Sequence, residues 1–201
     1  MSSTIKVAKQ SLRKAIAAKL SLLSPKDVLA QSSTVSHLVQ ELAAFKSSQL
    51  VALYMSMPGI EIDTLDLIRR CFEQHKTVYL PSCSDEAGKP MKTMRFLKVG
   101  SFDEVLALQP RGKYKLREPT EGVDAMLLGS IDLVIVPGVA FTKEGYRLGH
   151  GAGYYDRFLS EFQLRFDKKP FLVGVGLADQ MVDSLPIEPH DWTLDEVIVG
   201  Q

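Results

Sequence analysis

Continuous apolar runs of strand length alternate with helix-patterned segments along most of this chain, and this alternation limits the folds that the chain can adopt. Apolar runs of the kind found in strands covered on both faces lie at residues 49–56, 77–81, 131–138, 170–177 and 195–200. Around and between them, apolar residues recur at helical spacing in residues 4–20, 24–46, 61–75 and 154–166. The pattern predicts an α/β fold of three layers (αβα), in which helices cover both faces of a mainly parallel, mixed central sheet.

Two of the predicted helices carry local start signals. Ser24 is a candidate N-cap, with Pro25 in the first turn and Asp27 near the positive end of a helix that we expect to run to about Lys46. Asp63 is the candidate N-cap of the helix that follows.

The middle of the chain is less regular. Residues 84–90 predict a turn, residues 91–99 a strand, and residues 100–129 short elements joined by loops, because glycines, prolines and charges are frequent there. No internal repeat and no long linker divides the sequence. A chain of 201 residues with 45% hydrophobic composition can build one sizeable core. We therefore expect a single α/β domain over residues 1–201.

Charge and composition argue against several functions. Lys plus Arg equals Asp plus Glu at 24 each, whereas nucleic-acid-binding proteins are usually basic or carry a basic face, so we expect no nucleic-acid partner. No apolar run approaches the roughly 20 residues that a membrane helix needs, so we expect no membrane partner. Cys71 and Cys83 match neither a disulfide framework nor a metal motif. We interpret them as idle thiols in a reducing compartment.

The N-terminal segment leaves two interpretations open. No acidic residue precedes Asp27, and basic residues and serines are frequent there, as in a mitochondrial presequence. The alternative is an amphipathic helix of the mature fold, because Ile5, Ala8, Leu12 and Ile16 recur at helical spacing. We favour the helix. With no secretory signal visible, we expect a cytoplasmic protein, with the mitochondrion as the alternative.

Two loops are the first candidates for a binding site. In open α/β sheets, ligands bind beyond the carboxyl ends of the strands. The segments MSMPGIE (residues 55–61) and PGVAFTKEGYRLGHGAGYYD (residues 137–156) each follow a predicted strand. We expect these two loops to lie close together.

The second loop has features of an anion site. Gly149, Gly151 and Gly153 precede a predicted helix, and glycines let backbone N–H groups approach a phosphate near the positive helix end. Arg147 can add a fork of donors and His150 a further donor. The spacing matches neither the P-loop nor the dinucleotide fingerprint, and a tight connection into the helix is the alternative interpretation.

Aromatic and acidic residues follow the glycines. Tyr154 and Tyr155 can stack on a flat heterocycle, and Asp156 can bind Mg²⁺ together with substrate phosphates. The alternative is that both tyrosines pack in the core and that Asp156 stabilises the start of the helix.

Charged residues elsewhere are weaker candidates. Lys6, Lys9 and Arg13 share one face of the first helix and would add cations to a polyphosphate if that helix lay over the glycine loop; a solvated face is the alternative. Glu61 can accept hydrogen bonds from a polar heterocycle or be an ordinary first-turn acid. Two aspartates before the last strand are either metal carboxylates or turn residues: Asp191 and Asp195.

Taken together, these residues make the chain resemble the 5-formyltetrahydrofolate cyclo-ligase family, also called 5,10-methenyltetrahydrofolate synthetases. The resemblance rests on KQSLRK, YMSMPGIEIDT, VPGVAFTKEGYRLGHGAGYYDRFL and LPIEPHDWTLDEVIV, which stand in the family's order over nearly the whole chain. It implies a reaction that depends on ATP and Mg²⁺. ATP phosphorylates the formyl oxygen of 5-formyltetrahydrofolate, and a neighbouring amine nitrogen closes the ring to give 5,10-methenyltetrahydrofolate, ADP and phosphate.

The resemblance also implies roles for individual residues. It implies that ATP is bound by Lys9, Gln10, Ser11, Leu12, Arg13, Arg147, Leu148, Gly149, His150, Gly151, Ala152, Gly153, Tyr154 and Tyr155. It implies folate contacts from Met55, Glu61, Tyr114 and Tyr155, and Mg²⁺ ligands at Asp156 and Asp191. The residues expected to act in catalysis are Arg147, Tyr155 and Asp156.

One departure from the family affects the phosphate site. Some members have basic residues where this chain has His150 and Ala152. Charge neutralisation here must therefore depend more on Arg147, the loop backbone and the N-terminal lysines, and His150 contributes a charge only when it is protonated.

Two alternative functions stay open at this point. One is a phosphosugar-binding or isomerase-like α/β protein that uses the same glycine loop without ATP. The other is a non-catalytic folate-binding protein. In each case we expect small-molecule ligands and a monomer.

Overall fold

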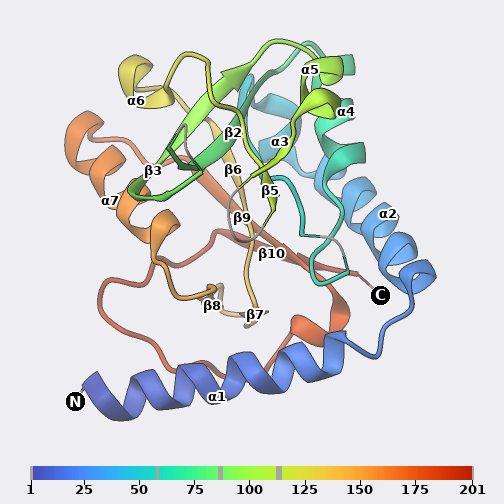
Figure 1. Cartoon of the computed structure of the whole chain (residues 1–201), viewed down its shortest axis with the longest axis vertical. Coiled ribbons are helices and arrows are strands. Elements are labelled where there is room, and N and C mark those ends of the chain that lie inside the picture. Colours follow the sequence, from blue (N-terminus) through green and yellow to red (C-terminus); the bar gives the residue numbers. More distant parts are fainter. Residues whose placement is uncertain (1, 58, 86–87, 112–114, 201) are drawn as a thin grey trace.

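A six-stranded mixed sheet forms the centre of the molecule (Figure 1). The computed structural model describes residues 2–57, 59–85, 88–111 and 115–200. The strands follow the order β10-β9-β6-β1-β2-β3, and all pair in parallel except β3, which is antiparallel to β2. Their bounds are β1 Leu50–Ala52, β2 Thr77–Ser84, β3 Pro90–Val99, β6 Leu133–Val136, β9 Phe171–Gly176 and β10 Glu196–Val199.

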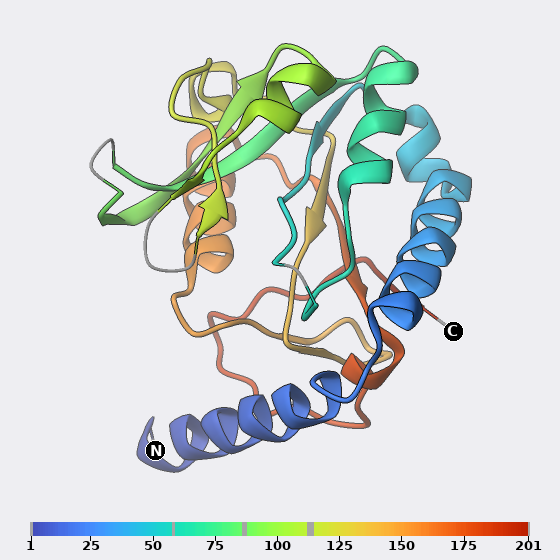
Figure 2. The same cartoon turned by 45° about the vertical axis from the view of Figure 1, so that its right-hand side comes forward.

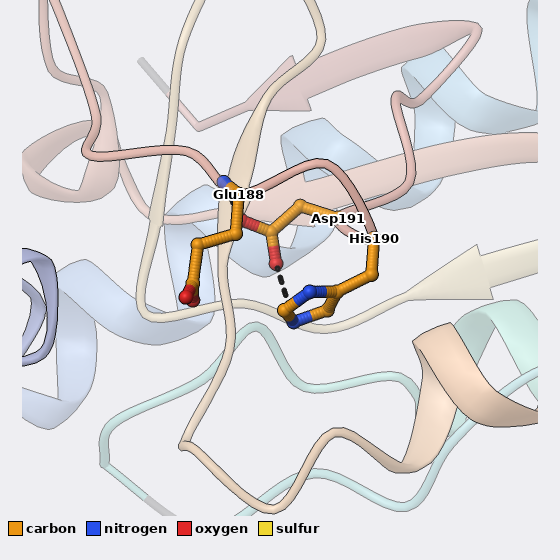
Figure 3. A group of neighbouring side chains, drawn as sticks. All are labelled: Glu188, His190 and Asp191. Atoms are coloured by element: carbon orange, nitrogen blue, oxygen red, sulfur yellow. Dashed lines mark hydrogen bonds and ion pairs between the residues drawn. The ribbon is translucent and has the colours of Figure 1, made fainter. Parts of the chain in front are cut away.

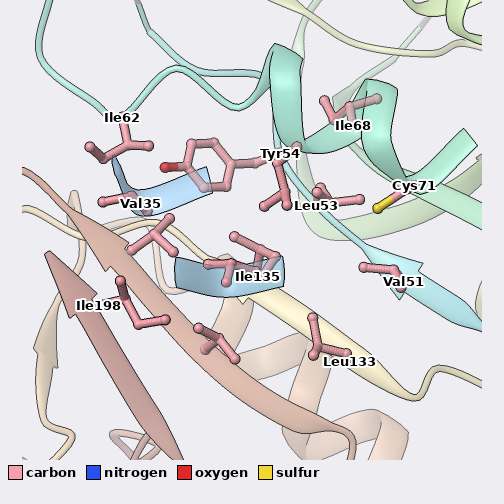
Figure 4. Close-up of a cluster of buried hydrophobic side chains, with 14 of the residues drawn as sticks. Val35, Val51, Leu53, Tyr54, Ile62, Ile68, Cys71, Leu133, Ile135 and Ile198 are labelled. Carbon is pink, nitrogen blue, oxygen red and sulfur yellow. The ribbon is translucent and has the colours of Figure 1, made fainter. Parts of the chain in front are cut away.

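Helices cover both faces of this sheet and bury two separate cores. On one face, α2 (Pro25–Glu41), α3 (Ala43–Ser47), α4 (Leu65–Glu73) and α5 (Phe102–Ala107) pack against side chains such as Leu133 and Ile135 (Figure 4). On the other face, α7 (Tyr154–Phe166) packs Phe158 and Phe162 against the sheet, beside the short α6 (Ala125–Leu128). The predicted three-layer α/β fold with a mainly parallel, mixed sheet is confirmed.

The first helix, α1 (Ser2–Leu20), lies away from both helical layers, across one end of the molecule (Figures 1 and 2). Its second half packs against the first core, through the buried Ile16 and Leu20 and the partly buried Leu12. The rest of α1 lies along the glycine loop and the segment before β10, to which Lys9 and Arg13 are bonded. The predicted helix over residues 4–20 is therefore present, and it lies over the candidate phosphate loop.

Helix boundaries follow the predicted signals with two corrections. Ser24 caps α2 with a full capping box to Asp27, and Pro25 is its first residue. The predicted run to Lys46 is wrong, because α2 ends at Glu41. Leu42 is extended, packs its side chain on the core, and α3 begins after it. Burial of one leucine thus overrides a continuous helical pattern.

The second correction concerns the start of α4. Thr64, not Asp63, is the N-cap, and its hydroxyl donates to the backbone oxygen of Tyr54. The Asp63 carboxylate accepts from the backbone N–H of Leu65 at 2.9 Å, so it still satisfies a first-turn donor.

The strands and loops also differ in extent from the predictions. The apolar run 49–56 contributes only the three residues of β1 to the sheet, whereas β2 extends to Ser84. The predicted strand at 91–99 is β3, and the irregular middle holds α5, α6 and the small ribbon of β4 (Pro110–Arg111) and β5 (Leu116–Arg117). The long loop after β6 folds into a second ribbon, β7 (Ala140–Phe141) with β8 (Arg147–Leu148), and a short 3₁₀ helix, η1 (Ala178–Gln180), follows β9.

Among the described residues, no helix combines the length and apolar character needed to cross a bilayer. That the chain forms a single domain stays a prediction.

Candidate active site

The two loops predicted to form a site meet directly. Nε2 of His150, in the glycine loop, lies 3.3 Å from Oε1 of Glu61, in the loop after β1. The Glu61 side chain is only 5% exposed, and its other oxygen accepts from the backbone N–H of Met57 at 2.7 Å. One buried carboxylate therefore joins the candidate folate loop to the candidate phosphate loop.

The glycine loop is shaped by backbone that other residues rarely adopt. Gly151 and Gly153 have φ of 105° and 68°, and Gly153 is the N-cap of α7. These left-handed conformations favour glycine and turn the chain sharply into the helix. A thirteen-residue helix therefore begins at the loop, and the N–H groups of its first turn form the positive end to which a phosphate is attracted.

Helix α1 supplies the neighbouring cation. The Nε of Arg13 donates to the backbone oxygen of Gly149 at 2.8 Å, and its guanidinium lies against Gly151. Burial lowers the pKa of Arg13 somewhat, although Asp191 opposes this shift. The arginine remains charged and holds α1 on the loop that we expect to bind phosphate.

Lys9 bonds α1 to the segment before β10. Its ammonium donates to Asp191 at 2.7 Å and to Glu188 at 2.9 Å. Burial would lower the pKa of Lys9, but the hydrogen bonds and charges of the two carboxylates outweigh it and raise that pKa. Of the other predicted ATP contacts on α1, Leu12 packs against the core, and two residues are exposed: Gln10 and Ser11.

Arg147 and Asp156 form a largely buried ion pair. Their nitrogen and oxygen are 2.8 Å apart, and the two side chains are 5% and 19% exposed. The same Asp156 oxygen accepts from the backbone N–H of Trp192 at 3.3 Å. The residue predicted to bind phosphate thus holds the residue predicted to bind metal, and both lie beside the segment that carries Asp191.

The two tyrosines differ in their surroundings. Tyr154 donates its hydroxyl to the backbone oxygen of Met91 at 2.9 Å, which ties α7 to β3. The Tyr155 ring packs edge-on to Phe96 and beneath the guanidinium of Arg147. Its hydroxyl is buried without a hydrogen-bond partner among the described residues. Burial, followed by the nearby Cys83 and Glu61, raises the pKa of Tyr155 well above its ordinary value.

A cluster of three side chains that could bind a metal ion lies in the segment before β10. The ligand atoms of Glu188, His190 and Asp191 all lie within 4.8 Å of one another (Figure 3). Carboxylate oxygens are ligands that Mg²⁺ prefers, so Asp191 and Glu188 fit this ion by their chemistry. Asp156 is not a member of this group, although Trp192 connects it to the same segment.

The remaining predicted residues are less central. Met55 is half-buried and packs against the first core, Leu148 is buried in it, and Ala152 is exposed. Tyr114 lies outside the described residues. Asp195 accepts from the backbone N–H of Leu172 and from Lys169, contacts that favour the structural alternative for this residue over metal binding.

Comparison with known proteins identifies the family of this chain. The model of the 5-formyltetrahydrofolate cyclo-ligase family matches residues 5–200. The chain belongs to this family. The 5-formyltetrahydrofolate cyclo-ligase of Saccharomyces cerevisiae is 36% identical over 96% of this chain and 95% of its own length.

Other relatives match most of the chain, one in its solved structure and one in its sequence. The NMR structure of the 5,10-methenyltetrahydrofolate synthetase of Aquifex aeolicus superposes with a TM-score of 0.72 at 31% identity, over 95% of this chain and 88% of that one. A relative of Arabidopsis thaliana, named as a mitochondrial 5-formyltetrahydrofolate cyclo-ligase, is 28% identical over 94% of this chain and 73% of its own length. The predictions of the family and of an ATP-dependent ligase are confirmed.

Two acidic residues of this family member were missed by the sequence analysis. Glu188 carries no motif signal except its place in EPHDW, and its role as a partner of Lys9 depends on the packing of α1. Glu118 stands in an irregular segment rich in charges, and only the fold shows that it is buried.

Proposed function

We propose that this chain converts 5-formyltetrahydrofolate to 5,10-methenyltetrahydrofolate with release of ADP and phosphate, and that it does so at the meeting point of α1, the glycine loop and the Glu61 loop. The proposed reaction is supported by the family match over residues 5–200. The proposed position of the active site is supported by the contact between His150 and Glu61, because it joins the loop expected to bind phosphate to the loop expected to bind folate.

The chemistry needs positioning more than a protein nucleophile. The formyl oxygen attacks the γ-phosphorus of ATP and displaces ADP, so that a poor leaving group becomes a phosphate ester. The neighbouring amine nitrogen then attacks the activated carbon, loses its proton, and phosphate departs with the former formyl oxygen. Holding the two substrates in line and neutralising the phosphate charge supply most of the rate enhancement in such a transfer.

The phosphates of ATP are assigned to the glycine loop and its neighbours. The N–H groups at the start of α7 provide fixed dipoles, and Arg13 and Arg147 provide charge. His150 adds a hydrogen bond, and a charge only when protonated. Arg147 also restrains the Tyr155 ring, so it orients a residue on the folate side.

The metal is assigned to Asp156 and Asp191, with Glu188 beside them. When bound, Mg²⁺ supplies charge neutralisation on the ATP phosphates. Arg147 holds Asp156, and Lys9 holds Asp191 and Glu188, which fixes these carboxylates in place before substrate arrives.

The folate is assigned to the opposite wall. Glu61 is held in one orientation by the N–H of Met57, and Tyr155 offers a buried hydroxyl beside it. Met55 adds apolar contact, and Tyr114 stays a predicted folate contact.

The direct test is absorbance. Purified protein mixed with 5-formyltetrahydrofolate and MgATP should develop the near-ultraviolet band of the methenyl product, and omission of ATP or chelation of the metal should abolish it. ADP release measured with and without folate should show the same dependence. A folded protein that binds folate but forms no band would be the non-catalytic folate-binding protein. Phosphosugar binding without ATP consumption would support the isomerase-like alternative.

Assembly and compartment are separate proposals. We propose that the protein is monomeric and cytoplasmic. The contacts of Lys9 and Arg13 support the interpretation of α1 as a helix of the mature fold and not as a presequence. Sedimentation would test whether the protein is a monomer. Imaging of the tagged full chain would test the cytoplasmic location against the mitochondrial alternative.

A further inference from the structure

Glu118 has no role in the site proposed above. Its carboxylate is buried, and one of its oxygens lacks a hydrogen-bond partner among the described residues. The residue is 5% exposed, directly after β5, and its Oε2 has no hydrogen-bond partner among the described residues. Burying a carboxylate oxygen without a partner is costly. A buried polar atom without a partner calls for an explanation, and a bound ligand that supplies the missing bond is one such explanation.

Glu118 belongs to a group of buried polar side chains that borders the proposed folate site. Its carboxylate lies against the Cys83 thiol near the end of β2. Cys83 in turn interacts electrostatically with Tyr155, whose hydroxyl also lacks a described partner, and Tyr155 interacts with Glu61. The chain of neighbours therefore runs from Glu118 through Cys83 and Tyr155 to Glu61.

The two acids of this group differ in what they can still bind. Both oxygens of Glu61 are engaged, one by the N–H of Met57 and one by His150. Burial, followed by Glu118, raises the pKa of Cys83 to about 12, so the thiol stays protonated and can donate one hydrogen bond to the carboxylate. Oε2 of Glu118 is thus the carboxylate oxygen of this group that has no hydrogen-bond partner among the described residues.

A ligand that fits this oxygen must present N–H donors to a carboxylate. Within the proposed folate substrate, the pyrimidine ring of the pterin carries an N–H next to an exocyclic amino group, and these two parallel donors match the two oxygens of a carboxylate. We propose that Glu118 binds this edge of the pterin and so orients the folate, with Cys83 and Tyr155 on the adjoining wall. This inference rests on the proposed function and names a substrate-binding residue for it.

The variant that tests it is Glu118→Gln. Glutamine keeps the volume but replaces one acceptor oxygen by an amide donor, which would face the donors of the pterin. We expect KM for 5-formyltetrahydrofolate to rise roughly 10- to 100-fold, as for the loss of a charged hydrogen bond. KM for ATP should change less than about twofold. Glu121→Gln, an exposed acid of the same segment, is the matched control and should resemble the unchanged protein.

A second measurement includes a comparison on the unchanged protein, which does not depend on how the variant folds. Binding of 5-formyltetrahydrofolate and of its analogue lacking the 2-amino group is compared by calorimetry, without ATP. The unchanged protein should bind the analogue at least about tenfold more weakly, and Glu118→Gln should reduce that discrimination. Equal binding of both compounds by the unchanged protein, or an unaltered folate KM in a folded Glu118→Gln variant, would overturn the proposal. Failure of the proposed function itself would be distinct, because the unchanged protein would then form no methenyl product.

Discussion

At the scale of single residues, Asp156 has both a proposed catalytic role and a structural role. It is assigned to the metal, and it is also the partner of Arg147, whose side chain is 5% exposed. Loss of the carboxylate charge would leave a buried guanidinium short of a partner. Activity and stability therefore depend on the same oxygen atoms.

The variant Asp156→Asn tests both roles, because its expected effect on activity is large and its expected effect on stability is moderate. We expect kcat/KM to fall at least ~100-fold, about 2.7 kcal/mol, because the proposed metal ligand loses its charge. The free energy of unfolding should fall by about 1–3 kcal/mol, which leaves the protein folded. Kinetics and urea denaturation measure the two effects. Glu161→Gln, exposed on the same helix, should show neither, and retention of more than a tenth of the rate by Asp156→Asn would refute the metal role.

The two thiols give a prediction about pH. Burial raises the pKa of both Cys71 and Cys83 to about 12, above the ordinary value near 8.5. Because the folded-state pKa is raised, the stabilising contribution is complete below about pH 8.5 and is lost as the pH rises toward 12. We expect the free energy of unfolding to decline over that window.

Alkylation provides the check. At pH 8, iodoacetamide should label the native cysteines at least ~100-fold more slowly than in denaturant, since only the thiolate reacts. A cysteine introduced by Ser33→Cys, at an exposed position, should label quickly. Native Cys83 reacting as fast as that control would contradict the burial argument.

Residue roles differ in how far the sequence could reveal them. The glycines, Arg147 and Asp156 stand in one contiguous motif, so their proximity follows from the chain itself. Glu118 and Glu188 have no such signal, because burial and partnership with Lys9 are properties of the packed fold. The resemblance suggested which residues share a site, but it did not show that Arg147 holds Asp156.

At the scale of elements, α1 is the piece that completes the site. Its C-terminal end is fixed by Ile16 and Leu20, whereas its middle is held by the polar contacts of Lys9 and Arg13. The sequence predicted this helix from its spacing, and it also predicted α7 with the observed bounds. It failed at Leu42, where core packing interrupts a helical pattern, and in the long loop, where β7 and β8 pair.

The polar attachment of α1 can be tested with Arg13→Gln. Loss of the contact to the oxygen of Gly149 should raise KM for ATP about 5- to 30-fold, or ~1–2 kcal/mol, and leave KM for the folate nearly unchanged. Steady-state kinetics with each substrate varied in turn makes the measurement. Lys14→Gln, at the next and exposed position, is the control. Equal increases in both KM values would mean that Arg13 supports the whole site and not the ATP side.

At the scale of the whole molecule, the proposed site joins distant parts of the chain. The bond from Lys9 to Asp191 spans 182 positions, and that from His150 to Glu61 spans 89. A ligand that requires all of these contacts binds only the folded chain, so its binding energy adds to the stability of the entire cooperative unit.

Thermal unfolding with MgATP tests this together with the single-domain prediction. We expect one transition, and ATP at about 100 times its Kd should stabilise it by ~2.7 kcal/mol, a shift of roughly 5–10 °C for a chain of this size. Arg13→Gln should shift less at the same ATP concentration, because its affinity is lower. A midpoint independent of protein concentration would agree with a monomer. Two transitions, of which ATP moved only one, would mean that the chain divides into separately folding parts and that the proposed site lies within one of them.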